Sequence, residues 1–421
     1  MKGVVQMIKV CKIRIYPNKT QEKIIFRTLG ACRYVYNLYL DYNKKKYDES
    51  SEFLSGYDFA KILTKLKKED ERYDWLNDIS SKALKDSIMN AEKAFKFFFN
   101  GNNGFPNFKT KKDKVQSYFF IKDNIHFNTG NKNIIKLPIL GNVRITERDY
   151  LPEKPKITSG RVIYDHNKFF VSFIYNTPME KDMEVLSYGM GIDVGIATYA
   201  TIYRRNVYND TIDTFLNDEK YINYTNRIKR LQKLVSFKVE ENYKSLYHEY
   251  MKIHDKEPDN KTKQNIMKKG GCYNTSNIKC LRKKIVNAQY KCNNYVKDKI
   301  NKMVISLVRT KPEYITIEDL SIKKMLENSG DKTLHDHIQK SKFGYFRKKM
   351  EEKCLEYKVE LRVANKYFAS SKKCSNCGYK NKNLTLNHRV YICPECGLKI
   401  DRDLNAAINL CNLKEDKYTI L

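Results

Sequence analysis

Four cysteines late in the chain have the spacing of a metal site. Cys374 and Cys377 form one Cys-x-x-Cys pair, and Cys393 and Cys396 form a second pair after fifteen intervening residues. A Zn²⁺ ion takes four thiolates in a tetrahedron, and two tight turns that each supply two sulfurs satisfy this geometry. A glycine follows each second cysteine and permits the positive φ that such a turn needs. The pattern predicts one structural zinc ion in a small ribbon, with a hairpin at 384–392 between the pairs.

Three acidic residues stand where elements are expected to begin or end. Asp193 lies in a glycine-punctuated β run, Glu318 ends a short apolar strand, and Asp403 opens a late helix. Carboxylates suit Mg²⁺, and two such ions about 4 Å apart can hydrolyse a phosphodiester. The glycines beside Asp193 would let the ions and the phosphodiester approach the backbone. Taken singly, Asp193 could be a turn acid, Glu318 a strand-end charge and Asp403 a helix N-cap. The three acids would converge if their elements formed an RNase-H-like sheet.

The composition favours a polyanionic partner. The 421 residues include 80 Lys and Arg against 49 Asp and Glu, a net charge of +31. Such a surplus is typical of nucleic-acid-binding proteins, although codon bias in an AT-rich genome is an alternative source of lysine. The length suggests about two to three domains. Without an apolar membrane span or secretory signal, the eleven cysteines indicate a reducing compartment, the cytoplasm, and metal rather than disulfides.

The first half of the chain combines a strand, a helical block and several short strands. Residues 8–16 alternate in polarity as a strand does, and Asn18 with Gln21 is typical of a helix capping box. Helical spacing then continues to about residue 100, with the second helix at about 57–68 and the third at about 80–100. Short strands are then expected at 118–121, 134–137, 143–145, 161–164 and 169–174, and they suggest a small barrel or sandwich. The first strand would belong to the same domain if the helical block is an insertion.

The second half predicts strands that alternate with long helices. A strand and hairpin are expected over 188–203, and two long basic helices over 219–308, joined by a glycine-containing loop at 256–278. The remaining elements predicted are a strand at 314–317, a helix at about 338–358, a strand at 359–363 and a helix at 404–413.

Beyond these local patterns, the ordered motifs resemble one protein family. The relevant stretches are GIDVGIATYAT (191–201), ITIEDLSI (315–322), VANKYFASSKKCSNCG (363–378), CPECG (393–397), DRDLNAAINL (401–410), KIRIYPNKTQEK (12–23), CRYVYNLYL (32–40) and FPNFKTKK (105–112). In this order they closely resemble the TnpB family of RNA-guided nucleases, which insertion sequences encode and which are relatives of the miniature type V CRISPR effectors. The resemblance runs along nearly the whole chain.

The resemblance implies an α+β multidomain fold. An RNase-H-like (RuvC) α/β nuclease domain with an inserted zinc ribbon would follow a β-rich wedge domain that carries a helical insertion. The implied boundaries are 1–19 for the first wedge strand, 20–111 for the helical recognition domain, 112–186 for the rest of the wedge, 187–373 for the first nuclease part, 374–396 for the ribbon and 397–421 for the last nuclease part.

The resemblance also implies the site residues. Asp193, Glu318 and Asp403 fall on the three RuvC acids, which would hold two catalytic Mg²⁺ ions. Asp401 competes with Asp403 for the third role, and we prefer Asp403 because it stands two residues before the Asn of the D-x-N-A-A motif. The four cysteines fall on the family's zinc ligands.

A guide RNA and a double-stranded DNA target are the implied partners. Basic side chains would contact the nucleic-acid backbone, which gives affinity without sequence information, while the guide supplies sequence. A solvated helix face is the alternative for each of them. The candidates are Arg27, Arg33, Lys109, Lys111, Lys112 and Arg282, and the basic run continues to Lys114.

Three other functions fit parts of the sequence. A miniature type V CRISPR effector would differ mainly in its genomic neighbour. A non-catalytic nucleic-acid-binding protein would use only the ribbon and the charge, and an unguided resolvase or transposase of the same fold would cleave without RNA. The oligomeric state stays open.

Overall fold

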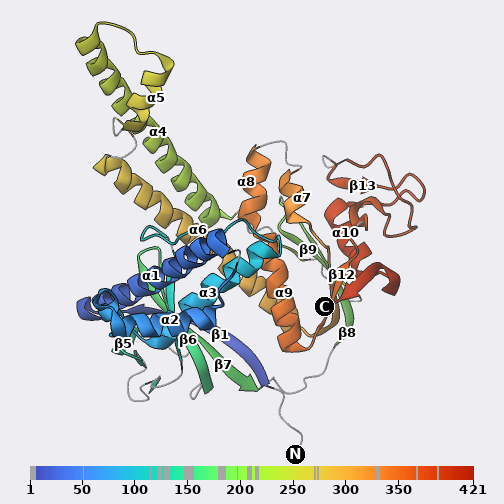
Figure 1. The fold of residues 1–421 in the computed structure, drawn as a ribbon. Helices are drawn as coiled ribbons and strands as arrows, with labels where there is room; N and C mark the ends of the chain where they lie inside the picture. The colour runs from blue at the N-terminus through green and yellow to red at the C-terminus, as the bar shows by residue number, and fades with distance from the viewer. Residues whose placement is uncertain are drawn as a thin grey trace, which may run out of the picture. The chain divides into compact units, whose positions relative to one another are not determined.

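A computed structural model divides the chain into two compact units, Met1–Met179 and Glu180–Leu421, which we call the first and second units (Figure 1). The structure describes residues 6–50, 52–113, 115–121, 126–127, 133–146, 156–178, 186–196, 198–205, 211–213, 218–269, 272, 275–327, 332–366, 368–385 and 388–421. Within these ranges, none of the helices combines the length and the apolar character that a membrane span requires.

The first unit contains one antiparallel sheet. Its strands are β1 (Gln6–Tyr16), β2 (Val115–Ile121), β3 (His126–Phe127), β4 (Ile134–Leu137), β5 (Gly141–Ile145), β6 (Lys156–Asp165) and β7 (Lys168–Pro178). In the order β2-β6-β7-β1-β5-β4-β3, β1 lies between strands that are more than a hundred residues away in sequence. The first strand therefore belongs with the later ones, as predicted. The sandwich prediction is wrong because there is one sheet, and no pairing among the described residues joins β2 to β3 to close a barrel.

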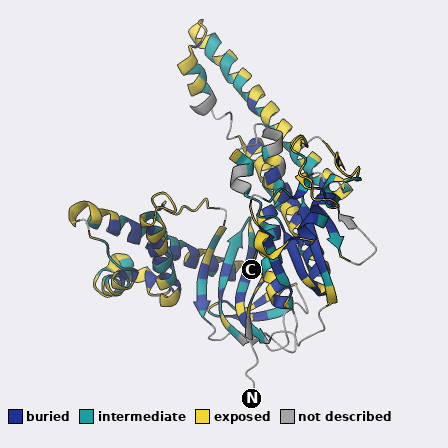
Figure 2. Ribbon diagram, turned by 90° about the vertical axis from the view of Figure 1, so that its right-hand side faces the viewer, coloured by how far each residue is buried: buried dark blue, intermediate teal, exposed yellow. Residues whose placement is uncertain are grey.

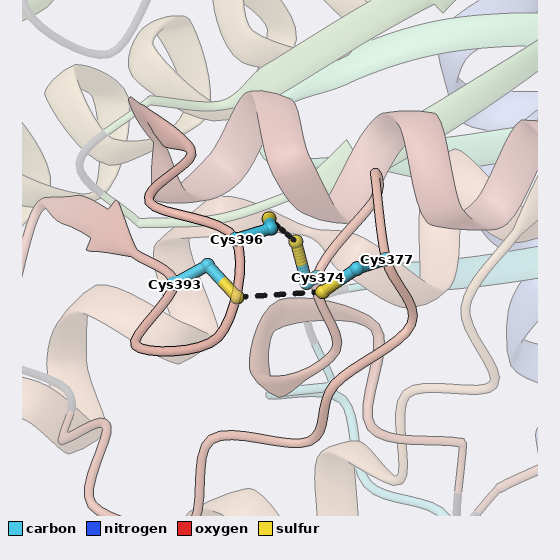
Figure 3. Close-up of side chains that lie close together, drawn as sticks. All are labelled: Cys374, Cys377, Cys393 and Cys396. Atoms are coloured by element: carbon cyan, nitrogen blue, oxygen red, sulfur yellow. Dashed lines mark hydrogen bonds between the residues drawn. The ribbon is translucent and has the colours of Figure 1, made fainter.

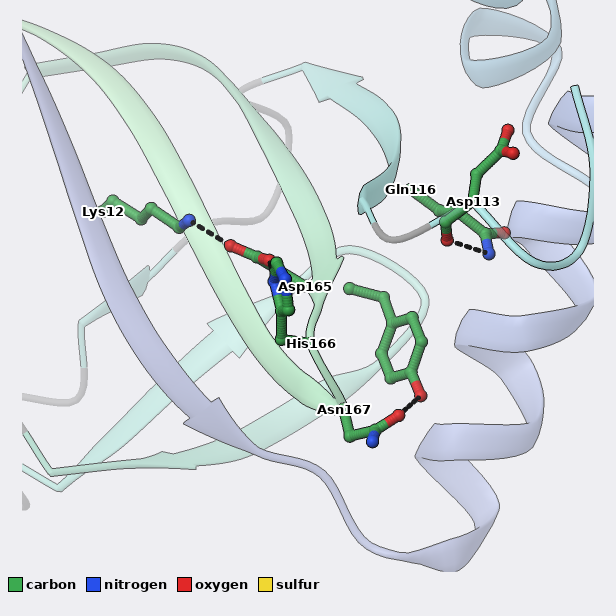
Figure 4. Close-up of polar contacts among 7 residues, drawn as sticks. Lys12, Asp113, Gln116, Asp165, His166 and Asn167 are labelled. Atoms are coloured by element: carbon green, nitrogen blue, oxygen red, sulfur yellow. Dashed lines mark hydrogen bonds and ion pairs between the residues drawn. The ribbon is translucent and has the colours of Figure 1, made fainter. Parts of the chain in front are cut away.

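A tight turn between β6 and β7 fixes the register of the longest hairpin. His166 and Asn167 both have positive φ, at 47° and 62°, as a two-residue turn that follows the sheet twist requires. The hydroxyl of Tyr164 donates to the Asn167 side chain at 2.7 Å, and Lys12 of β1 pairs with Asp165 at 3.3 Å (Figure 4). The first contact lies within the β6–β7 hairpin, and the second connects the central strand β1 to the end of β6, two strands away in the sheet order.

The helical block of the first unit comprises α1 (Lys19–Ser50), α2 (Gly56–Glu69), a 3-10 turn at Glu71–Leu76 and α3 (Ser81–Phe99). The predicted capping box is confirmed: the Gln21 N–H donates to the Asn18 side chain at 2.8 Å, and the Asn18 N–H donates to the Gln21 side chain at 3.0 Å. The N-terminal part of α1 packs on the sheet through Ile25 and Leu29, while its later part packs through Val35 against α2 and α3. One long helix thus contributes to two cores.

The second unit is built on a six-stranded mixed sheet. Its strands are β8 (Leu186–Val194), β9 (Ala200–Arg204), β10 (Thr211–Asp213), β11 (Pro312–Ile317), β12 (Glu360–Ala364) and β15 (Tyr418–Ile420), in the order β10-β9-β8-β11-β12-β15. The three strands β8, β11 and β12 are parallel to one another; β9 and β15 are antiparallel to them, and β10 pairs antiparallel with β9. Parallel strands end at the same edge of a sheet, so residues that follow β8 and β11 are neighbours.

The helices of this unit are α4 (Glu219–His254), α5 (Asn260–Lys269), α6 (Ser276–Arg309), α7 (Ile322–Glu327), α8 (Lys332–Ser341), α9 (Phe343–Tyr357) and α10 (Arg402–Cys411). Two short turns, Ser370–Lys372 and Glu415–Lys417, are 3-10 helical, and a small sheet pairs β13 (Val390–Ile392) with β14 (Lys399–Asp401). The core of the unit lies where Val296 and Ile300 of α6 and Phe346 of α9 meet the central strands.

Two predicted elements differ from the structure. The predicted loop at 256–278 contains the helix α5, and the predicted helix at 338–358 is interrupted at Lys342, which has a φ of 57° between α8 and α9. Much of α4 is exposed, as Figure 2 shows, and a small separate core of Val239, Cys272 and Ile278 holds the far part of the α4–α6 hairpin together. This hairpin extends away from the main core of its unit.

Candidate active site and metal centre

The two strand-end acids meet at one edge of the second sheet. Asp193 is the penultimate residue of β8, and Glu318 directly follows β11. Ile192 and Ile317 are register partners in the parallel pairing, so the acid after each of them lies at the same level. Both side chains line a cavity of about 750 Å³, and Asp403 of α10 lines it as well. The three predicted acids are therefore brought together by the fold.

The choice between Asp401 and Asp403 follows from the start of α10. Asp401 is the N-cap residue, and its carboxylate accepts the N–H groups of Asp403 at 2.9 Å and Leu404 at 3.0 Å. Asp401 is exposed and does not line the cavity, whereas Asp403 does. The capping role considered for Asp403 thus belongs to Asp401.

Gly191 of β8 is where α10 approaches the sheet. A Cβ atom at this position would lie 2.0 Å from the carbonyl oxygen of Ala407 and 2.5 Å from the amide nitrogen of Cys411. Both atoms belong to the backbone of α10, so neither can move without the helix. The prediction that glycines here admit ions and phosphodiester is wrong for Gly191, because the space that it leaves is filled by the helix that carries Asp403.

We expect Gly191→Ala to destabilise the second unit by about 1–3 kcal/mol or more, the usual cost of overpacking a core. The added methyl group must push α10 from β8 and move Asp403 from the other acids. Thermal unfolding and nuclease assays measure the two effects. Gly104→Ala is the matched control, because a Cβ there meets nothing within 4 Å. If Gly191→Ala were as stable as this control, the close approach of α10 would be refuted.

Burial and like charge dominate the electrostatics of the acids. Burial raises the pKa of Asp193 well above its ordinary value, and the negative charges of Glu318 and Asp403 raise it further. Burial also raises the pKa of Glu318, and a hydrogen bond from the Ser370 hydroxyl acts in the opposite direction. Arg402 donates to Asp403 from two nitrogens, at 2.9 and 3.1 Å. Such a set of acids is stabilised by added positive charge, as a divalent metal supplies.

In the metal-free protein, we expect Asp193→Asn to raise the thermal midpoint of unfolding, and to do so more strongly as the pH rises. A carboxyl group with a raised pKa binds more protons when folded, so its contribution to stability falls as the pH rises from its unfolded pKa, about 4, toward the folded value. Near pH 4 the variant and the wild type should unfold alike. Above pH 4 the asparagine avoids the cost of ionising a buried acid. Each kcal/mol of added unfolding free energy raises the thermal midpoint by about 2–4 °C.

The control for this pH dependence is Asp401→Asn, which keeps a good N-cap residue and changes an exposed acid nearby. Its midpoint should differ little from that of the wild type at every pH. A pH-independent effect of Asp193→Asn, measured by calorimetry across this range, would contradict the assigned burial of the acid.

The four cysteines of the ribbon come together as predicted. Their sulfurs all lie within 4.8 Å of one another, with Cys374 and Cys396 at 3.7 Å and Cys377 and Cys393 at 3.5 Å (Figure 3). Tetrahedral zinc, with Zn–S bonds of about 2.3 Å, needs sulfurs about 3.8 Å apart. The two measured sulfur separations are close to this value, so the four side chains could hold a zinc ion.

The two cysteine turns have the same construction. Gly378 has a φ of 80° and donates its N–H to the Cys374 carbonyl at 3.0 Å, and Gly397, with a φ of 70°, donates to the Cys393 carbonyl at the same distance. The hairpin predicted at 384–392 is wrong in part: its second half forms β13, but the partner strand is β14, beyond the second turn. Leu386 and Asn387 in that segment lie outside the described residues.

Only two of the six basic residues predicted to contact nucleic acid line a common cavity in the structure. Arg33 and Lys109 line a second cavity of about 120 Å³ in the first unit, together with Arg161, which sequence reasoning missed. Arg27 instead pairs with the exposed acid Asp78. The remaining candidates are exposed in the structure, namely Lys111, Lys112 and Arg282, whereas Lys114 lies outside the described residues.

The carboxylate cavity also contains residues that sequence reasoning missed. Its walls include the basic side chains of Lys382 and Arg389 from the ribbon and of Arg402 from α10, together with Ser370. Arg402 lies inside the DRDLNAAINL motif, which could have indicated it, whereas no sequence signal marks Ser370. Cations opposite a carboxylate cluster are an arrangement suited to a phosphodiester bound across metal ions.

Comparisons with known proteins agree with this fold. A family model described as the Cas12f1-like TNB domain matches residues 343–410, and a helix-turn-helix domain model of the IS605 OrfB type matches residues 7–52. The second region folds here as a strand and one uninterrupted helix, β1 and α1. The solved structure of a Cas12f1–sgRNA–target DNA complex is similar with a TM-score of 0.54 and 13% sequence identity, over 97% of this chain and 99% of that one.

The fold is thus a mixed α/β, Cas12f1-like fold with a four-cysteine ribbon. A Streptomyces pristinaespiralis protein provisionally named an RNA-guided DNA endonuclease is 26% identical over 96% of this chain and 89% of its own length. The similarly named InsQ of Escherichia coli (strain K12) is 22% identical over 96% of this chain and 91% of its own length. TnpB-like protein L79 of Acanthamoeba polyphaga mimivirus is 24% identical over 95% of this chain and 72% of its own length. The chain is thus similar, along most of its length, to proteins named RNA-guided DNA endonucleases or TnpB-like proteins.

Proposed function

We propose that this protein is an RNA-guided DNA endonuclease of the TnpB type that acts in association with DNA transposition and cuts its target next to a short flanking motif. The observation that carries the proposal is the convergence of Asp193, Glu318 and Asp403, from β8, β11 and α10, on one cavity. The strand order and the parallel centre of the sheet suit an RNase-H-like (RuvC) nuclease domain. The names of the relatives support nuclease activity and guidance by RNA.

The three carboxylates would hold two Mg²⁺ ions, which supply an activated water and neutralise charge on the leaving oxygen. A bound divalent ion would favour the ionised carboxylates of Asp193 and Glu318 and so oppose the effect of burial, which raises the pKa of both groups. Lys382 and Arg389 line the same cavity and would bind the phosphodiester, whereas Arg402, which also lines it, is paired with Asp403. The four ribbon cysteines would hold one zinc ion with no open position, which makes that ion structural.

A guide RNA explains the basic surface of the chain. The charge surplus of +31 suits two polyanions, a structured RNA and a DNA target. Arg33, Lys109 and Arg161 of the first-unit cavity are candidates for backbone contacts, which position nucleic acid without reading its sequence. Base pairing with the guide would then supply sequence specificity.

Sequencing the RNA that copurifies with the protein tests this function. We expect a discrete RNA species, and Mg²⁺-dependent cleavage of a plasmid that contains its matching target. Cleavage by RNA-free protein would instead indicate an unguided nuclease, and binding without any cleavage would indicate a non-catalytic zinc-ribbon protein. Either result would overturn the proposal.

A further inference from the structure

A short segment at 370–375 connects the carboxylate cavity with the zinc ribbon. At its start, Ser370 is buried and donates its hydroxyl to a carboxylate oxygen of Glu318. Four residues later, Cys374 contributes the first sulfur of the metal centre. A movement of this segment would therefore change both the carboxylate cavity and the four-cysteine centre, because one end contacts Glu318 and the other end carries Cys374.

Two asparagines of α10 hold the middle of this segment. The Asn405 side chain donates to the Lys373 carbonyl at 2.7 Å and accepts the N–H of Ser375 at 2.9 Å. The Asn409 side chain donates to the carbonyls of Ser370 at 2.8 Å and Lys373 at 2.7 Å. Asn405 is fully buried and Asn409 is 8% exposed. We call these two residues the asparagine clamp.

The clamp ties the segment to the helix that carries the third acid. Residues four apart lie on one side of a helix, so Asn405 and Asn409 face the segment together, while Asp403 of the same helix lines the cavity. On its other side α10 is held against β8 by the backbone contact at Gly191. Removing the Asn409 amide takes away the donor that it gives to the Ser370 carbonyl, while the Lys373 carbonyl keeps the donor from Asn405. Loss of a hydrogen bond to a buried carbonyl is costly, so the start of the segment is expected to shift.

We propose that the asparagine clamp transmits the state of the zinc centre to the catalytic carboxylates. Zinc bound by the four cysteines would fix segment 370–375, the clamp would set its position against α10, and Ser370 would thereby orient Glu318 relative to Asp403. Asn405 and Asn409 are then positioning residues, and the zinc centre affects how tightly the carboxylates bind their divalent ions. This inference rests on the proposed nuclease function.

The test measures metal binding directly, with Mn²⁺ as a paramagnetic probe of the carboxylate site in the zinc-loaded protein. We expect Asn409→Ala to retain about one equivalent of zinc and its binding of nucleic acid, but to bind Mn²⁺ about 10–100-fold more weakly, the range seen when partners behind metal ligands are removed. Asn412→Ala is the control, because this residue is exposed just beyond the end of the same helix, and its Mn²⁺ affinity should stay within about twofold of the wild type.

A double-mutant cycle with Cys396→Ser decides whether the zinc centre and the clamp are coupled. Cys396 belongs to the second cysteine turn, outside segment 370–375. If the clamp transmits the effect of zinc, Cys396→Ser alone weakens Mn²⁺ binding, and adding it to Asn409→Ala weakens binding little further. Independent effects that multiply, or an Asn409→Ala protein with wild-type Mn²⁺ affinity, would overturn the inference. If the Asp193→Ala protein instead bound Mn²⁺ as tightly as the wild type does, the proposed function itself would be refuted.

Discussion

Replacing Asp193 with alanine is expected to reduce DNA cleavage by about 10²–10³-fold or more, the range seen when one preorganised charged or polar group is removed from an active site. Asp193 is buried near the end of β8 and shares its cavity with Glu318 and Asp403, each of which has its own proposed role at the metal ions. Binding of RNA and of target DNA should persist, because the substitution leaves the basic side chains of this cavity and of the first-unit cavity unchanged. Cleavage and gel-shift assays on the same preparation measure both quantities.

Asp401→Asn is the matched control for this experiment. It changes an acid two residues from Asp403 that caps α10 and stays outside the cavity. Cleavage should remain near the wild-type rate, because asparagine is also a good N-cap residue. If Asp401→Asn were as inactive as Asp193→Ala, the third acid would have been assigned to the wrong residue.

Cys393→Ser is expected to reduce bound zinc from about one equivalent to none and to unfold the ribbon. The core of the ribbon consists of Cys374, Leu384, Tyr391 and Cys393, so two of its four buried side chains are proposed zinc ligands. A module of this size depends on its metal, since structural zinc contributes about 10–16 kcal/mol of binding free energy in small zinc domains. Atomic absorption measures the zinc, and limited proteolysis measures the folding of the ribbon.

Cys280→Ser is the control, because Cys280 is an exposed cysteine on α6, far from the ribbon in sequence. It should retain zinc and cleavage. DNA cleavage should be lost in Cys393→Ser, because Lys382 and Arg389 of the ribbon line the carboxylate cavity. A zinc-free ribbon that still resisted protease and supported cleavage would show that the metal is dispensable.

The sequence was sufficient for those features that depend on short-range patterns. The four cysteines converge because two tight turns carry them, and each turn is encoded in five residues. The helix capping box at Asn18 and the burial of Cys11, Ile13 and Ile15 on one face of β1 likewise follow from local spacing. The convergence of the three acids followed from the order of elements, once a parallel sheet was assumed.

Features that depend on distant partners were not predictable in this way. The function of Gly191 depends on the backbone of α10, and the environment of Ser370 depends on Asn409, a residue of the same helix. The break at Lys342 could not be read from its residue type, because a positive φ at lysine is imposed by the surrounding packing and not favoured locally. The partner of β13 was missed because the second cysteine turn itself serves as the hairpin loop.

The contribution of α10 to the cavity also determines when the site can form during synthesis. Chains fold as they emerge, the N-terminal parts first. A nascent chain that ends within the ribbon already contains β8, β11 and two of the acids, but it lacks Asp403 and the helix that packs on Gly191. The cavity that the three acids line can therefore be completed only after the ribbon has been synthesised, so the order of the elements along the chain delays assembly of the site.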